Sequence, residues 1–171
     1  RLYVHGHQVT GHERYAQVAT EVVDYVLRDL RLEGGGIASA EDADSATPDG
    51  RSVEGEFYVF TPDEVRAAVG PDLADVALEH WELDRPANFE GRWIPARTYP
   101  RGRWARSPEI EQARTLLFER RSRRPRPGLD DKVLTEWNAH WVSALAEAGS
   151  ALGRLERCFH RAESFKFMNS S

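Results

Sequence analysis

The amino-acid sequence predicts a mainly α-helical fold, in which helical hairpins are joined by loops that include a short β-hairpin. Apolar residues recur at helical spacing from about His12 to Leu30 and from Leu134 to Leu152. Glycines follow both stripes, at Gly34 and Gly153, where the helices are expected to end. The segments between the helices are rich in acidic, aromatic, Gly and Pro residues. The loops therefore hold the residues that distinguish this chain.

Local capping signals set the boundaries of the predicted helices. Gly11 is expected to close a helical hairpin, because glycine adopts the left-handed conformation that ends many helices. Thr61 and Glu64 form a capping box around Pro62, so a helix is predicted to begin there. Further helices are predicted over Leu73–His80, from Ser107 to Arg124, and over Leu155–Phe167.

The start of the last strong helix and the loops between the helices are assigned from residue types. Asp130 is a good N-cap, so the last strong helix is expected to begin there, with Leu129 and Leu134 packed as a hydrophobic staple. Aromatic and β-branched residues predict a strand over Glu56–Thr61, paired with Ile37–Ala40. The stretch from Glu82 to Arg106 lacks periodicity, and loops of that length in compact domains are usually functional or disordered.

Composition and charge exclude several classes of protein. The 171 residues are 40% hydrophobic and 30% charged, as in soluble globular proteins, and no apolar run is long enough to span a membrane. A net charge of −5 argues against nucleic acid as a partner. Cys158 is the one cysteine, which fits a reducing compartment, so a cytoplasmic location is expected. The absence of an initial Met leads us to expect a piece of a larger chain.

No cofactor and no metal are expected. His5, His7 and His12 straddle a turn, and no Cys or further His is placed to complete a metal site. The arginines between Arg114 and Arg126 lack the regular interleaving with aromatic residues that an RNA site would show. We interpret them as a solvated face or a contact for an acidic partner.

Loop carboxylates are the candidate catalytic residues. Asp42 and Asp44 would project the same way from an extended backbone, as acid–base chemistry or a hard cation requires. The alternative is that both cap turns through bonds to their own backbone. Glu54, Glu56 and Tyr58 would share one strand face, which suits a polar ligand cleft and equally an edge strand.

Two further clusters combine amide, carboxylate and aromatic groups. Asn88 and Glu90 lie two residues apart beside a glycine. Asp131 and Asn138 would lie about two turns apart on one helix face, with Trp137 adjacent. Asn138 has poor helix propensity and needs a polar partner. An aromatic beside carboxylate and amide groups is common in sugar sites, although caps, core and surface pairs would explain the same residues.

Taken in order, these clusters resemble one family. The matching segments are Gly35–Ser45, Glu54–Thr61, Asn88–Gly91 and Asp130–Asn138. The family is that of thioredoxin-domain-containing proteins related to spermatogenesis-associated protein 20, also called the DUF255 family, and the resemblance covers roughly residues 1–153. The sequence departs from its usual pattern at Ile37, Ala87 and Ala139, and the tail after Gly153 does not look like the family's next helix.

The resemblance implies a fold and a place in a longer protein. Full-length members look like two successive domains, an N-terminal thioredoxin-like domain and then an (α/α) toroid of the six-hairpin glycosidase type. The toroid is also similar to N-acylglucosamine 2-epimerases. Residues 1–153 would be a partial toroid and residues 154–171 a divergent or disordered tail. The thioredoxin-like domain would lie outside this chain and act as its partner. The four clusters would converge on a funnel lined by loops.

Two hypotheses of function follow. In the first, the domain binds or processes a sugar or sugar-like molecule: Asp42, Glu54, Glu90 or Asp131 would act as acid and base, and Asp44, Tyr58, Asn88, Trp137 and Asn138 would hold the substrate. In the second, the domain is a non-catalytic binding module or scaffold attached to a thiol-redox module. Carboxylates facing each other across one site favour the first hypothesis, and carboxylates used as caps and surface pairs favour the second.

Overall fold

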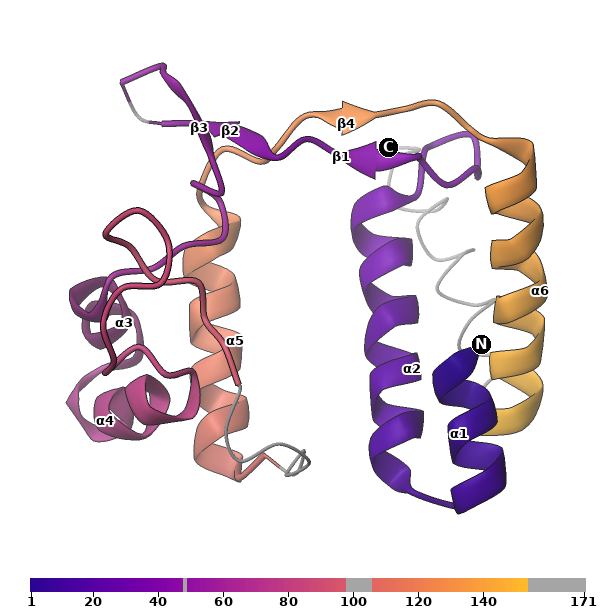
Figure 1. Ribbon diagram of the computed structural model, residues 1–171, viewed down its shortest axis with the longest axis horizontal. Helices are drawn as coiled ribbons and strands as arrows, with labels where there is room; N and C mark the ends of the chain where they lie inside the picture. The colour runs from indigo at the N-terminus through magenta and orange to yellow at the C-terminus, as the bar shows by residue number, and fades with distance from the viewer. Residues whose placement is uncertain (48, 98–105, 154–171) are drawn as a thin grey trace, which may run out of the picture. The chain divides into compact units, whose positions relative to one another are not determined.

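The structure, a computed structural model, describes residues 1–47, 49–97 and 106–153 (Figure 1). Over these ranges it is mainly helical, as the sequence predicted, and it contains two short antiparallel strand pairs where one β-hairpin was expected. The chain divides into two compact units. Unit 1 comprises Arg1–Glu41 and the described residues from Leu129 onward, and unit 2 comprises Asp42–Gly128. Within the described ranges, no helix has the length and apolar character needed to cross a membrane.

Unit 1 is built from helices α1 (Leu2–Thr10), α2 (Glu13–Tyr25) and α6 (Thr135–Leu152), with the π-helix η1 (Val26–Leu30) continuing α2. Gly11 has φ 66° and donates its N–H to His7, which confirms the predicted hairpin turn. Val4, Ala19 and Ala148, one from each helix, form the buried core. Gly153 ends α6 in the left-handed conformation, as predicted, and the predicted helix Leu155–Phe167 lies outside the described residues.

A two-stranded ladder joins the loops of unit 1. Strand β1 (Ala40–Glu41) pairs with β4 (Leu129–Asp130), with Ala40 opposite Asp130. The predicted pairing of Ile37–Ala40 with Glu56–Thr61 is therefore wrong. Asp130 is also not an N-cap: its main chain is held in the ladder, its side chain accepts from Lys132, and α6 begins only at Thr135. Pairing with β1 overrides the local capping signal.

Unit 2 places three helices around a second core. Helices α3 (Pro62–Val69), α4 (Pro71–His80) and α5 (Pro108–Ser122) follow the predictions closely, and both halves of the capping box between Thr61 and Glu64 are present. A β-hairpin of β2 (Asp44–Ala46) and β3 (Ser52–Glu54) precedes them. The core includes Val65, Ala77, Leu83, Ala113 and Leu117. In Figure 1, α5 and the pair α3–α4 lie side by side, as their shared core requires.

The predicted strand Glu56–Thr61 is instead a turn. Gly55 has φ 70°, and its carbonyl accepts from the N–H groups of Tyr58 and Val59 at 2.8 and 3.1 Å. Only Phe60 retains a strand-like pairing, with Trp93. The aromatic and β-branched residues that suggested a strand are Phe57, Val59 and Phe60, and all three are buried. A turn can bury such residues as well as a strand can, so their burial does not require an extended backbone.

Arg124 holds this turn to the start of α3. Its side chain is 13% exposed and its Nη1 donates to the carbonyls of Glu56 and Phe57, at 3.2 Å each, and to that of Val59. Its Nη2 donates to one carboxylate oxygen of Glu64 at 3.0 Å, and the other oxygen of Glu64 accepts from the N–H of Thr61 in the capping box. The guanidinium also lies over the ring of Phe60. The interpretation of the arginine run as a solvated face is therefore wrong for Arg124.

We expect Arg124→Ala to lower the free energy of unfolding by about 2–4 kcal/mol, because three carbonyls and a carboxylate lose a half-buried charged donor. Arg123→Ala is the matched control, because Arg123 is the exposed neighbour on the same turn of chain. Urea denaturation followed by circular dichroism measures both. Equal stability of the two variants would contradict the role assigned to Arg124.

Candidate functional site

The base of the β2–β3 hairpin brings together three of the predicted site carboxylates, those of Asp42, Asp44 and Glu54. Asp44 lies directly opposite Glu54 in the register. The N–H of Gly55 donates to Ala43 and the N–H of Thr47 to Arg51, so the intervening pair of Asp44 and Glu54 is a non-hydrogen-bonded one. Side chains of such a pair approach most closely and point to the same face.

This pairing is unfavourable for the hairpin alone. Like charges directly opposite each other destabilise an antiparallel pair. Within the described part of the chain Glu54 makes no hydrogen bond or ion pair, and Asp44 accepts one weak bond at 3.4 Å from Ser52. Asp42 accepts from the N–H of Asp44 at 3.3 Å, which is the turn-capping role that the sequence left open.

Glu56 and Tyr58 do not share the face of Glu54, because the turn at Gly55 ends the strand. Glu56 forms an ion pair with Arg92. Tyr58 is half-buried, with the guanidinium of Arg121 lying 5.2 Å from its ring centroid. Both residues thus help to fix the loops of unit 2 around the arginines of α5 and of the Phe89–Arg92 turn.

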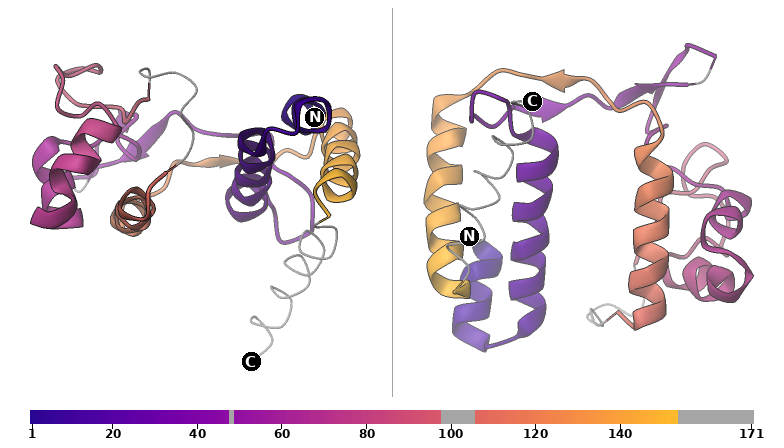
Figure 2. Two further views of the ribbon diagram at one scale, coloured as in Figure 1. Left: turned by 90° about the horizontal axis from the view of Figure 1, so that it is seen from below. Right: turned by 180° about the vertical axis from the view of Figure 1, so that it is seen from behind.

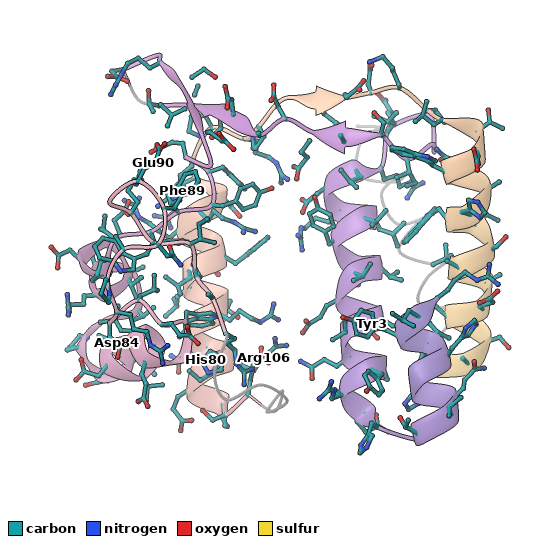
Figure 3. The ribbon with its side chains drawn as sticks, in the orientation of Figure 1. Tyr3, His80, Asp84, Phe89, Glu90 and Arg106 are labelled. Atoms are coloured by element: carbon teal, nitrogen blue, oxygen red, sulfur yellow. The ribbon has the colours of Figure 1, made fainter. Side chains whose placement is uncertain are left out.

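The Asn88–Gly91 cluster forms a tight hairpin, visible near the Phe89 and Glu90 labels in Figure 3. Phe89 and Arg92 exchange main-chain hydrogen bonds of 3.1 and 2.8 Å, and the central residues Glu90 and Gly91 have φ of 47° and 77°. Two positive φ values are what a type I′ turn requires. Asn88 is not free to bind a ligand: its amide donates to the carbonyl of Ile94 and accepts from its N–H.

Asn138 makes the same kind of contact in unit 1. Its Oδ1 accepts from the N–H of Ile37 at 2.9 Å and its Nδ2 donates to the carbonyl of Ile37 at 3.0 Å. The expectation that Asn138 needs a polar partner is confirmed, and the partner is the main chain. Asp131 precedes α6 and does not share a helix face with Asn138, so that part of the prediction is wrong. Trp137 is 57% exposed.

Hydrogen bonding and burial shift the pKa of Asp130 in unit 1 and that of His80 in unit 2. Hydrogen bonds from Lys132 and Ser39 hold the pKa of Asp130 below its usual value. Burial, together with the positive charges of Arg97 and Arg106, lowers the pKa of His80, whose Nε2 is buried without a hydrogen-bond partner among the described residues (Figure 3). In the described ranges, no three His, Cys, Asp or Glu side chains are grouped so as to hold a metal ion.

The structure thus separates the predicted residues by role. Asp44, Glu54 and Asp42 gather at one hairpin base, Glu90 lies exposed in its turn in the same unit, and Asp131 and Trp137 belong to unit 1. Asn88 and Asn138 bind main chain. Sequence reasoning missed Arg92 and misassigned Arg124. The available signal for Arg124 was its place in the run of arginines before Pro125, and Arg92 lies in no such run.

We expect Glu90→Asn to stabilise the chain by about 0.5–1 kcal/mol, because Asn tolerates the left-handed backbone that costs other residues roughly 1–2 kcal/mol. Glu33→Asn is the control, since Glu33 is an exposed loop glutamate without positive φ. Thermal unfolding of both variants gives the comparison. A lower melting temperature for Glu90→Asn than for Glu33→Asn would argue against strain at this turn.

We expect Asn138→Ala to cost about 1–3 kcal/mol, because both polar groups of Ile37 lose their partner. Ser150→Ala, at an exposed position of α6, should leave stability nearly unchanged. Hydrogen exchange at the Ile37 amide provides a local readout, and unchanged protection of that amide in Asn138→Ala would rule out the contact.

Comparison with known proteins places these features in a family. No family model matches the chain. It is 31% identical to human spermatogenesis-associated protein 20 and 29% identical to the mouse protein, over 97% and 98% of the chain respectively. An uncharacterised protein of Caenorhabditis elegans is 24% identical over 86% of the chain. The chain spans 25% of the length of each of these relatives. Over this quarter, the chain belongs to the family of spermatogenesis-associated protein 20, as its motifs predicted.

Proposed function

We propose that the chain is part of a carbohydrate-binding domain of the six-hairpin toroid type, and that Asp44 and Glu54 line its sugar site. The observation that supports this proposal best is the direct opposition of these two carboxylates on one face of the hairpin. A hairpin gains nothing from this arrangement. A ligand rich in hydroxyl groups does, because each carboxylate oxygen is a strong acceptor of hydroxyl hydrogen bonds.

A pair of opposed carboxyl groups is also what chemistry on a glycosidic bond uses. The Cβ atoms of a directly opposed pair lie about 4.5–5.5 Å apart. In retaining glycosidases, two carboxyl groups lie about 5–5.5 Å apart, one acting as acid and base and the other as nucleophile. A retaining reaction by this pair would require its carboxyl groups to stand at that separation, and an inverting reaction would require them further apart to admit water.

The remaining predicted residues are secondary candidates. Asp42, Glu90 and Asp131 are exposed carboxylates, and Trp137 is an exposed aromatic that can stack on a sugar ring. In the complete protein, we propose a thioredoxin-like domain as the partner of this one and a cytoplasmic location. Tyr58, Asn88 and Asn138 are less suited to hold substrate, because their polar groups or rings already serve the loops.

One observation favours the alternative of a non-catalytic binding module or scaffold attached to a thiol-redox module. Both asparagine amides that were expected to bind a sugar instead bind main chain, at Ile37 and Ile94. If loop motifs serve mainly to fix loop geometry, their acidic residues can equally be a contact surface for another domain.

The experiment that tests the proposal is a calorimetric screen of the 171-residue chain with mono- and oligosaccharides. We expect binding that is weakened at least tenfold by Glu54→Gln and by Asp44→Asn, with circular dichroism unchanged. Each amide keeps the size of the acid and removes its charge.

Glu79→Gln is the matched control, because Glu79 is an exposed glutamate of the same unit on α4. It should bind as the parent chain does. Absence of saccharide binding, or binding that survives both hairpin substitutions, would reject the carbohydrate proposal and favour the scaffold.

A further inference from the structure

His80, the last residue of α4, has a ring nitrogen that is buried without a hydrogen-bond partner. Its Nε2 is enclosed, and no described residue donates to it or accepts from it. The ring stands edge-on to that of Trp81, with the ring centroids 4.9 Å apart. Because Nδ1 is not among the buried unpartnered atoms, the neutral ring loses least by carrying its proton on Nδ1 and leaving Nε2 bare. A proton added to Nε2 has no acceptor among the described residues.

The chain between α4 and α5 places two arginines near this ring. Arg97 lies in that connection and Arg106 directly precedes the N-cap of α5, and both act electrostatically on His80 (Figure 3). Figures 1 and 2 show α4 lying beside α5, as the core that they share requires. Glu111, in the first turn of α5, is the acidic group that acts on His80 with the opposite sign.

Glu111 is already shared by two arginines. It forms ion pairs with Arg106 and with Arg114, whose Nε lies 3.0 Å from its carboxylate. Burial opposes the ionised form, but the hydrogen bonds from both arginines hold the pKa of Glu111 below its usual value. Glu111 therefore stays charged over the range in which a histidine titrates, and most of that charge is taken up before it can favour an imidazolium. Arg97 has no ion pair within the described ranges.

The contact nearest to this cluster is held by little. The N–H of Ala96 donates to the carbonyl of Trp81 at 3.0 Å, and this is the main-chain hydrogen bond that joins the described residues 95–97 to the end of α4. By contrast, the side chains of Trp81 and Trp93 pack against the core of unit 2. A disturbance at the end of α4 is therefore relieved most easily by moving residues 95–97.

We propose that His80 makes this contact sensitive to acid: uptake of a proton at Nε2 releases residues 95–97 from the end of α4. The added N–H finds no acceptor, and the added charge faces Arg97 and Arg106. Release takes Arg97 away from the ring and lets water reach Nε2, which relieves both penalties.

The direction of the effect follows from the pKa of His80 in the two forms. In the formed contact, burial and then the charges of Arg97 and Arg106 hold the pKa of His80 below its ordinary value of 6.5. In the released form the ring is solvated, so its pKa lies nearer to that value. The released form therefore binds more protons, and acid favours it as the pH falls below about 6.5. At higher pH the ring is neutral in both forms and the contact is complete.

Hydrogen exchange at the Ala96 amide of the 171-residue chain tests the proposal. Its protection factor, the exchange rate relative to that of an unstructured amide at the same pH, should fall by roughly threefold or more between about pH 7.5 and about pH 5. His80→Gln should remove this fall, because glutamine takes up no proton. His140→Gln is the matched control: His140 is 69% exposed on α6 of the other unit, and its loss should leave the fall unchanged.

A titration of the His80 ring by nuclear magnetic resonance gives a second readout that needs no variant at this position. We expect a pKa below 6.5 in the parent chain. Arg97→Gln should raise that pKa and reduce the fall in Ala96 protection, because a positive neighbour is lost.

Three results would each overturn the proposal: Ala96 protection that does not change with pH, an equal fall in His80→Gln, or a His80 ring that titrates at or above 6.5. Circular dichroism at about pH 7.5 shows whether His80→Gln folds, and the ring titration decides alone if it does not. Neither readout uses saccharide, so this proposal and the carbohydrate proposal fail independently.

Discussion

Main-chain hydrogen bonding in the loops is the constraint on which the rest of the structure depends. The helices satisfy most of their own backbone, but the described loops between them form only two short ladders. Side chains complete the bonding. Arg124 donates to the carbonyls of Glu56, Phe57 and Val59. Asn88 and Asn138 each bind both main-chain polar groups of one isoleucine. The amide group of asparagine suits this task, because it offers a donor and an acceptor side by side, like a neighbouring strand.

This constraint explains why residues that look functional in sequence divide into two groups. The first group consists of asparagines and arginines whose hydrogen bonds hold the loop in its conformation. The second group consists of the side chains that the loop then exposes. Glu54 and Glu90 are of the second kind, since each is exposed and neither has a partner within the described residues. The opposed carboxylates of Asp44 and Glu54 and the left-handed backbone of Glu90 both act against stability. Unfavourable features of this kind tend to occur where a ligand or partner acts.

The helices were predictable because their signals are local. The capping box at Thr61, the turn at Gly11 and the end of α6 at Gly153 depend on a few neighbouring residues, and all three are present. The errors came from pairings distant in sequence. Asp130 has the local features of an N-cap, but its main chain pairs with that of Ala40. The turn after Gly55 replaces a strand because Arg124 donates to carbonyls that a neighbouring strand would otherwise bind. The carboxylate site was predicted residue by residue, whereas its pairing of Asp44 with Glu54 depends on the hairpin register, which the sequence pattern had not identified.

On the proposed function, the Asp44–Glu54 pair is kept for a ligand at some expense of stability. A double-mutant cycle of Asp44→Asn and Glu54→Gln, measured by urea denaturation without ligand, tests it most directly. We expect each single substitution to raise the free energy of unfolding by a few tenths of a kcal/mol to about 1 kcal/mol. The second substitution should add less than the first, because one neutral partner already removes the repulsion. Destabilisation by either substitution, or simple additivity of the two, would contradict it.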